Sequence, residues 1–217
     1  MKFKKSEKDL LEFSKDKNCI IVGPSATMSG SGMGAFIDSF DVVIRLNNSY
    51  RKLKGFESDM GSKTDVLYHC LGVRDITNPY FKEWDKFKYV VFAAKVRTYK
   101  QKQKHHKTIP CSNILEPSKD FVNGVFEESG LHILTGTYSI LHSLTMNYKE
   151  VHAVGLTFFQ GGDTYIPCYY KRTKKEIDKD MNYCHHEHDK EFEFFSKKIK
   201  QYNDFFPHGV LKSLLGA

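Results

Sequence analysis

The sequence lacks the features that mark secreted, membrane-anchored or zinc-stabilised proteins. Its N-terminal segment, MKFKKSEKDLLEFSKDKNC, has no long apolar run, so it resembles neither a signal peptide nor a membrane-spanning helix. None of the five cysteines pairs with another in C-x-x-C spacing, which argues against a zinc ribbon or a thioredoxin-type dithiol. We therefore expect a reducing, cytoplasmic setting for a soluble or peripheral protein. A membrane anchor that this sequence does not include stays an alternative.

Neither the charge nor the hydrophobicity of the chain is extreme. Hydrophobic residues make up 40% and aromatic residues 14% of the 217 positions, which is typical of a globular protein. This length suits a single domain with its own core, and we expect one domain over residues 1–217 with a motif-bearing part at about 18–200. The net charge of +7 is compatible with an anionic partner and equally with plain solubility.

Compact apolar segments alternate with helical patterns along the chain. Buried strands are predicted at residues 19–23, 41–47, 64–72, 89–95 and 150–155. A first helix is expected after Ser6, which forms an S-x-x-D capping pattern with Asp9. The segment 135–149 predicts a later helix with Thr135 as its N-cap. Strands interleaved with helices are typical of a Rossmann-like α/β fold with a mainly parallel sheet.

Small and polar residues follow the predicted strands. Gly23 and Ser25 come after the first strand, Asn47 after the second, and Gly155 after the last. Ligands of open α/β sheets bind outside the carboxyl ends of the strands. We therefore expect these residues to lie near a site for a polar ligand.

Two glycine-containing patterns resemble phosphate-binding motifs, and neither fits one. A G-x-G-x-x-A match begins at Gly30, seven residues beyond the strand-ending Gly23, whereas a dinucleotide fingerprint opens the tight turn itself. The sequence GSKT at 61–64 has the wrong residue order for a Walker A loop and precedes a strand. The sequence predicts neither an NAD site nor a Walker A site.

Three segments, in this order, resemble the sialyl motifs of the animal-type sialyltransferases. Residues 19–69, CIIVGPSATMSGSGMGAFIDSFDVVIRLNNSYRKLKGFESDMGSKTDVLYH, resemble the large motif. Residues 134–156, LTGTYSILHSLTMNYKEVHAVGL, resemble the small motif and the T-S-G-V-Y region of the bacterial sialyltransferases. HDKEFE at 188–193 is similar to the very small motif, H-x-x-x-x-E. The resemblance implies the glycosyltransferase fold of that family, a GT-A variant.

The resemblance also implies an activity. These enzymes move an acidic sugar, sialic acid, from its cytidine monophosphate (CMP) ester to a glycan or glycolipid hydroxyl, with inversion. A histidine suits the general base near neutral pH, and hydroxyl and amide groups replace an obligatory metal. We therefore expect a CMP-sugar donor, no cofactor, no divalent metal, no nucleic-acid partner and no transmembrane segment. The oligomeric state stays open.

Site residues carry over from the family by position. His188 would be the general base, with Glu193 supporting its segment. The donor would be bound by Gly23, Ser25, Asn47, Thr135, Gly136 and Tyr165. Plainer roles stay open: a solvent-facing His188, an exposed Glu193, turn residues at Gly23 and Asn47, a helix cap at Thr135 and a core aromatic ring at Tyr165. Arg45 and Lys63, which also match motif positions, are interpreted as structural or solvated.

The chain departs from the family at several positions. Pro24 replaces the asparagine of G-N-S, Phe159 stands where the bacterial enzymes have a second tyrosine, and residues 167–171 do not show the short third motif. Cys19 matches one partner of the family's disulfide, but the other falls near Asn147. A CMP-Kdo-dependent transferase of the same fold and a non-catalytic nucleotide- or anion-binding protein therefore stay as alternatives.

The run CHHEH at 184–188 raises a zinc alternative. Its H-E-x-H spacing differs from the H-E-x-x-H of metalloproteases, and the adjacent His185 and His186 would diverge. We favour a catalytic histidine at the start of an amphipathic helix, with no metal ligands.

Overall fold

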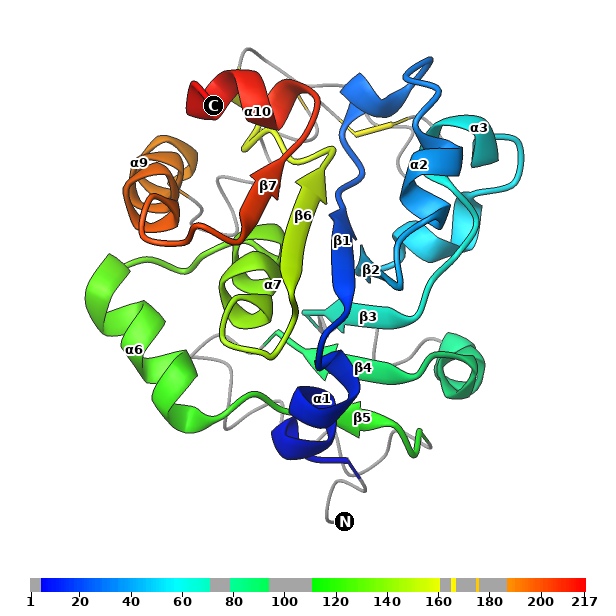
Figure 1. Ribbon diagram of the computed structural model, residues 1–217, viewed down its shortest axis with the longest axis horizontal. Helices are drawn as coiled ribbons and strands as arrows, with labels where there is room; N and C mark the ends of the chain where they lie inside the picture. The colour runs from blue at the N-terminus through cyan, green and yellow to red at the C-terminus, as the bar shows by residue number, and fades with distance from the viewer. Residues whose placement is uncertain (1–4, 71–78, 94–110, 161–164, 167–174, 176–186) are drawn as a thin grey trace.

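The computed structural model describes residues 5–70, 79–93, 111–160, 165–166, 175 and 187–217. Seven strands form one sheet in the order β5-β4-β3-β2-β1-β6-β7, and each neighbouring pair is parallel (Figure 1). The strands are β1 (Asn18–Val22), β2 (Val42–Leu46), β3 (Val66–His69), β4 (Tyr89–Phe92), β5 (Ile114–Leu115), β6 (Glu150–Val154) and β7 (Phe205–Pro207). The expected α/β fold with a mainly parallel sheet is confirmed.

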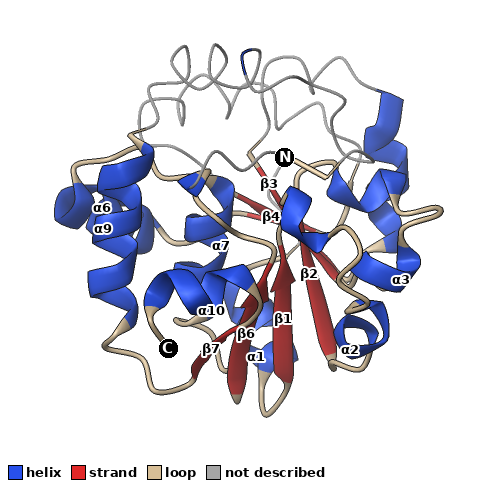
Figure 2. Cartoon of the chain, turned by 90° about the horizontal axis from the view of Figure 1, so that it is seen from above, coloured by secondary structure: helices blue, strands red, loops and turns tan. Residues whose placement is uncertain are grey.

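Helices cover both faces of this sheet. The α-helices are α1 (Glu7–Ser14), α2 (Gly34–Asp38), α3 (Glu57–Met60), α6 (Lys119–Ser129), α7 (Thr135–Ser143), α9 (His188–Ile199) and α10 (Val210–Leu215). Three 3-10 helices accompany them: η1 (Ala26–Met28), η2 (Ser49–Lys52) and η3 (Pro79–Lys86). In Figure 2, α6, α7 and α9 lie on one side of the sheet and α2 and α3 on the other.

The central strands are apolar because both of their faces are buried. Cys19 and Ile21 of β1 belong to the core cluster that includes residues of α7 and α9, whereas Ile20 and Val22 pack with residues of α2 and α3. Alternate residues of a strand point to opposite faces, so a strand covered on both sides needs a continuous apolar run. The predicted strand at 19–23 is such a run, whereas the one at 41–47 is interrupted by the buried Arg45.

The N-termini of two helices test the capping predictions. At α1, Ser6 accepts from the backbone N–H of Asp9, and the Asp9 carboxylate accepts from the Ser6 N–H at 2.6 Å, so the predicted capping box is confirmed. At α7 the N-cap is Leu134, without a side-chain cap, and Thr135 is the first helical residue. The prediction that Thr135 is the N-cap is therefore wrong by one position. The reason is a tertiary contact, because the carboxylate of Glu191 binds the Leu134 N–H at 2.8 Å.

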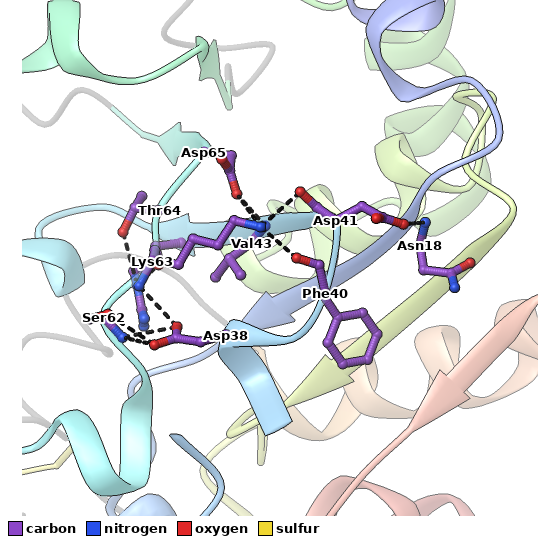
Figure 3. A network of polar contacts seen from close by, with 10 residues as sticks. Asn18, Asp38, Phe40, Asp41, Val43, Ser62, Lys63, Thr64 and Asp65 are labelled. Carbon is purple, nitrogen blue, oxygen red and sulfur yellow. Dashed lines mark hydrogen bonds and ion pairs between the residues drawn. The ribbon is translucent and has the colours of Figure 1, made fainter. Parts of the chain in front are cut away.

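Charged residues of the large motif hold the amino-terminal ends of β2 and β3 together (Figure 3). The Lys63 ammonium donates to the carbonyl of Asp41 at 2.9 Å and lies 3.5 Å from the Asp65 carboxylate. Asp38 accepts from the backbone N–H groups of Ser62 and Lys63. Burial alone would raise the pKa of Asp38, but these hydrogen bonds outweigh it and lower the pKa.

Arg45 is fully buried in the same motif. Its Nε donates to the carbonyl of Lys63 and the hydroxyl of Thr64, each at 3.0 Å, and its Nη2 donates to the carbonyls of Met60 and Gly61. These contacts agree with the structural interpretation of Arg45.

The glycine-rich turn after η1 binds a carboxylate of the protein itself. Asp59 accepts from the backbone N–H groups of Gly30 at 2.8 Å and Gly32 at 2.9 Å, and these bonds lower its pKa. Both glycines have positive φ, +74° and +64°, which residues with a side chain rarely adopt. The N–H groups of Gly30 and Gly32 therefore already have an acceptor within the protein.

Candidate active site

A pocket with a cavity volume of about 110 Å³ opens where β1, β2 and β6 end. It is lined by Pro24, Ser25, Leu46, Asn47, Leu134, Thr135, Gly136, Thr137, Gly155, Leu156, Thr157, Phe158, Phe159 and Tyr165. Five of the eight predicted site residues are in this lining: Ser25, Asn47, Thr135, Gly136 and Tyr165. Gly23, His188 and Glu193 are not in it.

Gly23 lies behind the pocket wall, at the point where β1 and β6 leave the sheet. Its N–H donates to the carbonyl of Val154 at 2.8 Å. A Cβ on Gly23 would overlap the carbonyl oxygen of Gly155, so the two chain segments approach closely only because residue 23 has no side chain. This contact explains the glycine by packing; contact with a nucleotide stays a prediction.

Ser25, which follows β1, lies next to Tyr165. They form an isolated antiparallel bridge, and the N–H of the following Ile166 donates to the carbonyl of Pro24 at 2.8 Å. The Ser25 hydroxyl accepts from the Thr27 N–H at 3.0 Å and thereby caps η1. Both predicted residues therefore face one cavity although they are far apart in the sequence.

Asn47 connects three elements at the pocket. Its backbone has a φ of +49°, a left-handed conformation that asparagine tolerates better than most residues. The side-chain oxygen accepts from the Cys70 N–H at 2.9 Å, and the side-chain nitrogen lies 3.4 Å from the Thr135 hydroxyl. The ends of β2 and β3 are thus joined to the start of α7, and the amide is oriented before any ligand binds.

The segment after β6 carries two aromatic residues in a strained conformation. Phe158 and Phe159 have φ values of +54° and +57°, which cost free energy for bulky residues and concentrate at functional sites. The Phe158 ring packs on the rings of Phe192 and Phe195 of α9, with centroids 5.3 and 5.0 Å away. The Phe159 ring contacts the ring of Tyr165, with centroids 5.3 Å apart. The strain is therefore offset by packing on α9.

His188 lies at the edge of the pocket, next to Phe159. It is the first residue of α9 and is half-buried, and its ring centroid is 5.0 Å from that of Phe159. The neighbouring Asp189 accepts from the Gln160 side chain at 3.0 Å. The predicted base is thus held beside the cavity, separated from it by one aromatic ring.

Glu191 is a site residue that the sequence analysis missed. Its side chain is 1% exposed and accepts from the Leu134 N–H and the Thr137 hydroxyl, whereas the predicted supporting residue, Glu193, is exposed. The signal was present in the sequence, because Glu191 shares a helix face with Phe195 and Ile199 at four-residue spacing.

By resemblance, the two positions of the family's disulfide fall at Cys19 and near Asn147. Cys19 is a free, fully buried thiol, and burial raises its pKa well above the usual range. The Asn147 side chain donates to the carbonyl of Leu11 at 3.2 Å, and its N–H donates to the Ser14 hydroxyl at 3.1 Å. Asn147 is therefore held to α1 by hydrogen bonds, and Cys19 forms no disulfide.

Some expectations concern residues that the structure does not describe. Cys184, His185 and His186 of the proposed zinc alternative, and the region of the third motif at 167–171, lie outside the described residues. Within the described part of the chain, no three His, Cys, Asp or Glu residues are arranged to hold a metal ion. In the same part, no helix has both the length and the apolar character that crossing a membrane requires.

The sequence model of glycosyltransferase family 29 (sialyltransferase) matches residues 2–114, just over half of the chain. The chain belongs to glycosyltransferase family 29. The predicted sialyltransferase family is thereby confirmed.

Individual family members match a shorter stretch. The CMP-N-acetylneuraminate-beta-1,4-galactoside alpha-2,3-sialyltransferase of Rattus norvegicus is 48% identical over 50 residues, which is 23% of this chain and 13% of the relative. Sialyltransferase-like protein 2 of Oryza sativa subsp. indica is 44% identical over 52 residues, which is 24% of this chain and 13% of that protein. The match therefore spans far less than two thirds of the length of either relative.

Solved sialyltransferases share the fold over most of the chain. The sialyltransferase CstII from Campylobacter jejuni, solved with cytidine-5'-monophosphate, has a TM-score of 0.64 and 15% identity, covering 93% of this chain and 84% of that one. A mammalian sialyltransferase solved with Gal-beta-1-3GalNAc-ortho-nitrophenol has a TM-score of 0.54 and 18% identity, covering 91% and 71% of the two chains. The family 29 chain thus has the sialyltransferase fold.

Proposed function

We propose that this family 29 chain is an inverting sialyltransferase. It transfers sialic acid from its CMP ester to a hydroxyl of a glycan or glycolipid, with His188 as general base and without a divalent metal. The observation that carries the proposal is the pocket, where Ser25, Asn47, Thr135 and Tyr165 meet within reach of one ligand. His188 lies beside that pocket, against Phe159.

The pocket supplies the groups that a departing CMP needs. Its phosphate gains negative charge as the bond to the sugar breaks, and hydrogen-bond donors stabilise that charge. The side chains of Ser25, Asn47, Thr135 and Tyr165 offer hydroxyl and amide donors. The N-terminus of α7 adds the positive end of a helix dipole at Thr135 and Gly136, a favourable place for an anion.

The acceptor hydroxyl must lose its proton as it attacks the sugar. A neutral imidazole accepts such a proton near pH 7, because its ordinary pKa lies close to that value. His188 lies at the pocket edge, and the strained Phe158–Phe159 pair fixes the wall against which it packs.

Pro24 supports two alternatives to a sialyltransferase function. It has no N–H, and its carbonyl accepts from Ile166, so this position offers the donor less than the family's asparagine does. A related acidic sugar on the same nucleotide, Kdo, and a chain that binds nucleotides or anions without turnover both remain compatible with the altered site.

Donor hydrolysis tests the proposal. The purified chain is incubated with CMP-Neu5Ac and, separately, CMP-Kdo, with EDTA present, and free CMP is measured over time. We expect slow release from CMP-Neu5Ac that an added glycan accelerates. Release from CMP-Kdo alone would reassign the sugar, and loss of release in EDTA would contradict metal independence.

Replacing the base gives the mechanistic test. We expect His188→Ala to lower kcat for transfer by about 10²- to 10⁴-fold, the usual contribution of a general base, while CMP still binds. His208→Ala is the matched control, because His208 lies after β7 and contacts His152 and Phe36. Equal activity of His188→Ala and wild type would exclude His188 as the base.

A further inference from the structure

A buried carboxylate joins the two helices whose first turns border the pocket. Glu191 of α9 is 1% exposed, and its Oε1 accepts from the backbone N–H of Leu134 at 2.8 Å and from the hydroxyl of Thr137. A buried carboxylate is stable only when donors replace the lost water, and these two groups do so. The contact therefore has a defined geometry.

The two hydrogen-bond donors, Leu134 and Thr137, flank the predicted donor-binding residues Thr135 and Gly136. Leu134 and Thr137 stand immediately before and after Thr135 and Gly136, and all four line the pocket. The Leu134 N–H belongs to the N-terminus of α7, where N–H groups have no partner within the helix and a negative charge is favourable. Glu191 is not in the pocket lining, so its carboxylate acts from behind the wall.

The backbone of Glu191 belongs to the first turn of α9. Glu191 follows His188 by three residues and so lies on the adjacent part of the helix surface. Its N–H donates to the carbonyl of Glu187 at 2.8 Å, which closes the first turn. The segment after β6 holds the opposite side of this turn, through the Phe159 ring on His188 and the Gln160 side chain on Asp189.

We propose that Glu191 is the positioning residue for His188. By fixing the first turn of α9 to the first turn of α7, it sets the distance between the base and the donor. The inference rests on the proposed function of the same site. Its physical basis is that a displacement of about 1 Å at a reacting group costs roughly 100-fold in rate.

Three substitutions separate positioning from general stability. Glu191→Ala removes both hydrogen bonds, whereas Glu191→Gln keeps an oxygen that accepts from the same two donors. Thr137→Val keeps the side-chain shape but removes the hydroxyl donor alone. Lys197→Ala is the control on the same helix, because Lys197 is exposed.

The first readout does not depend on activity. The imidazole resonances of His188 are assigned by comparison with His188→Ala, and they report the ring's position against Phe159. We expect these resonances to shift in Glu191→Ala, to shift less in Thr137→Val, and to stay unchanged in Glu191→Gln and Lys197→Ala. If Glu191→Ala fails to fold, Thr137→Val and Glu191→Gln still decide the question.

The second readout is the rate of donor hydrolysis per folded molecule. We expect kcat to fall about 10- to 100-fold in Glu191→Ala, with KM for the donor nearly unchanged and Glu191→Gln close to wild type. Loss of thermal stability with unchanged His188 resonances and unchanged kcat would overturn the proposal. A wild type that is inactive on both donors, but whose His188 resonances respond as expected, would overturn the proposed function and leave the positioning role standing.

Discussion

At the scale of single residues, two glycines show how differently the same residue type is used. Gly23 approaches the carbonyl of Gly155 so closely that a Cβ would overlap it. Gly124 lies inside α6, and a Cβ there would meet no atom of the rest of the protein within 4 Å. The first glycine is required by packing, and the second only weakens its helix.

We therefore predict opposite effects of alanine at these two positions. Gly23→Ala should lower the free energy of unfolding by about 1–3 kcal/mol, because the β1 and β6 exits must separate. Gly124→Ala should raise it by about 0.5–1 kcal/mol, because alanine favours the helix. Urea unfolding of both variants measures the difference. A stable Gly23→Ala variant would show that the close approach of the two strands is dispensable.

Single residues also show which parts of the candidate site the sequence could predict. Ser25, Asn47, Thr135, Gly136 and Tyr165 were placed together because motif order and strand ends both point to one edge of the sheet. Glu193 is predicted from the H-x-x-x-x-E motif match, and no sequence pattern of that motif points to Glu191. The burial of Glu191 depends on which face of α9 meets α7, and that is a tertiary property.

At the scale of elements, α1 is attached to the core by a series of hydrogen bonds from the buried Tyr68 and His142 to the partly buried Glu7. The His142 Nδ1 lies 2.8 Å from the hydroxyl of Tyr68, and its Nε2 lies 2.8 Å from the Glu7 carboxylate. Burial raises the pKa of Tyr68, so its hydroxyl stays protonated and donates to His142. The neutral ring then donates from Nε2 to Glu7.

The hydrogen bonds between Tyr68, His142 and Glu7 predict a loss of stability in acid. The bond to His142 lowers the pKa of Glu7 below its ordinary 4.5, and burial lowers the pKa of His142 below its ordinary 6.5. In both cases the unfolded state binds more protons than the folded state, so the free energy of unfolding decreases as the pH is lowered. The loss begins below about pH 6.5 because of His142 and continues below about pH 4.5 because of Glu7. Thermal unfolding of wild type and Glu7→Gln from pH 7 to 3 measures this.

Glu12→Gln is the matched control, because Glu12 lies exposed on the same helix. We expect the stability difference between wild type and Glu7→Gln to shrink as the pH falls below about 4.5, with no such change for Glu12→Gln. A difference independent of pH would show that the charge of Glu7 does not matter.

Element prediction succeeded where a strand is long and wholly buried. The runs of β1 and β2 are such cases, because all of their residues except Asn18 are buried. β5 and β7 were not predicted, because strands of two and three residues leave too short a pattern. The start of α7 was misplaced by one residue, because Glu191, which is distant in the sequence, replaces a local cap.

At the scale of the whole molecule, the proposed nucleotide binding should be coupled to folding. The pocket joins β1, β2, β6 and α7, so a ligand there binds only the folded chain. At 100 times its Kd, CMP should add about 2.7 kcal/mol, which for a chain of this size is a rise in Tm of roughly 5–10 °C. Thermal unfolding with CMP, with inorganic phosphate as control, tests this. Equal shifts would indicate a general anion site.

The position of β1 between β2 and β6 has a consequence for how the chain forms its site. Cys19 pairs with Val42 on one side and with Val151 on the other, so one neighbour is local and the other is separated by most of the sequence. Pairings between distant segments form late, because the intervening loop must close first. A nascent chain still on the ribosome can form β1 and β2 early. It has no pocket until β6 has emerged and paired with β1.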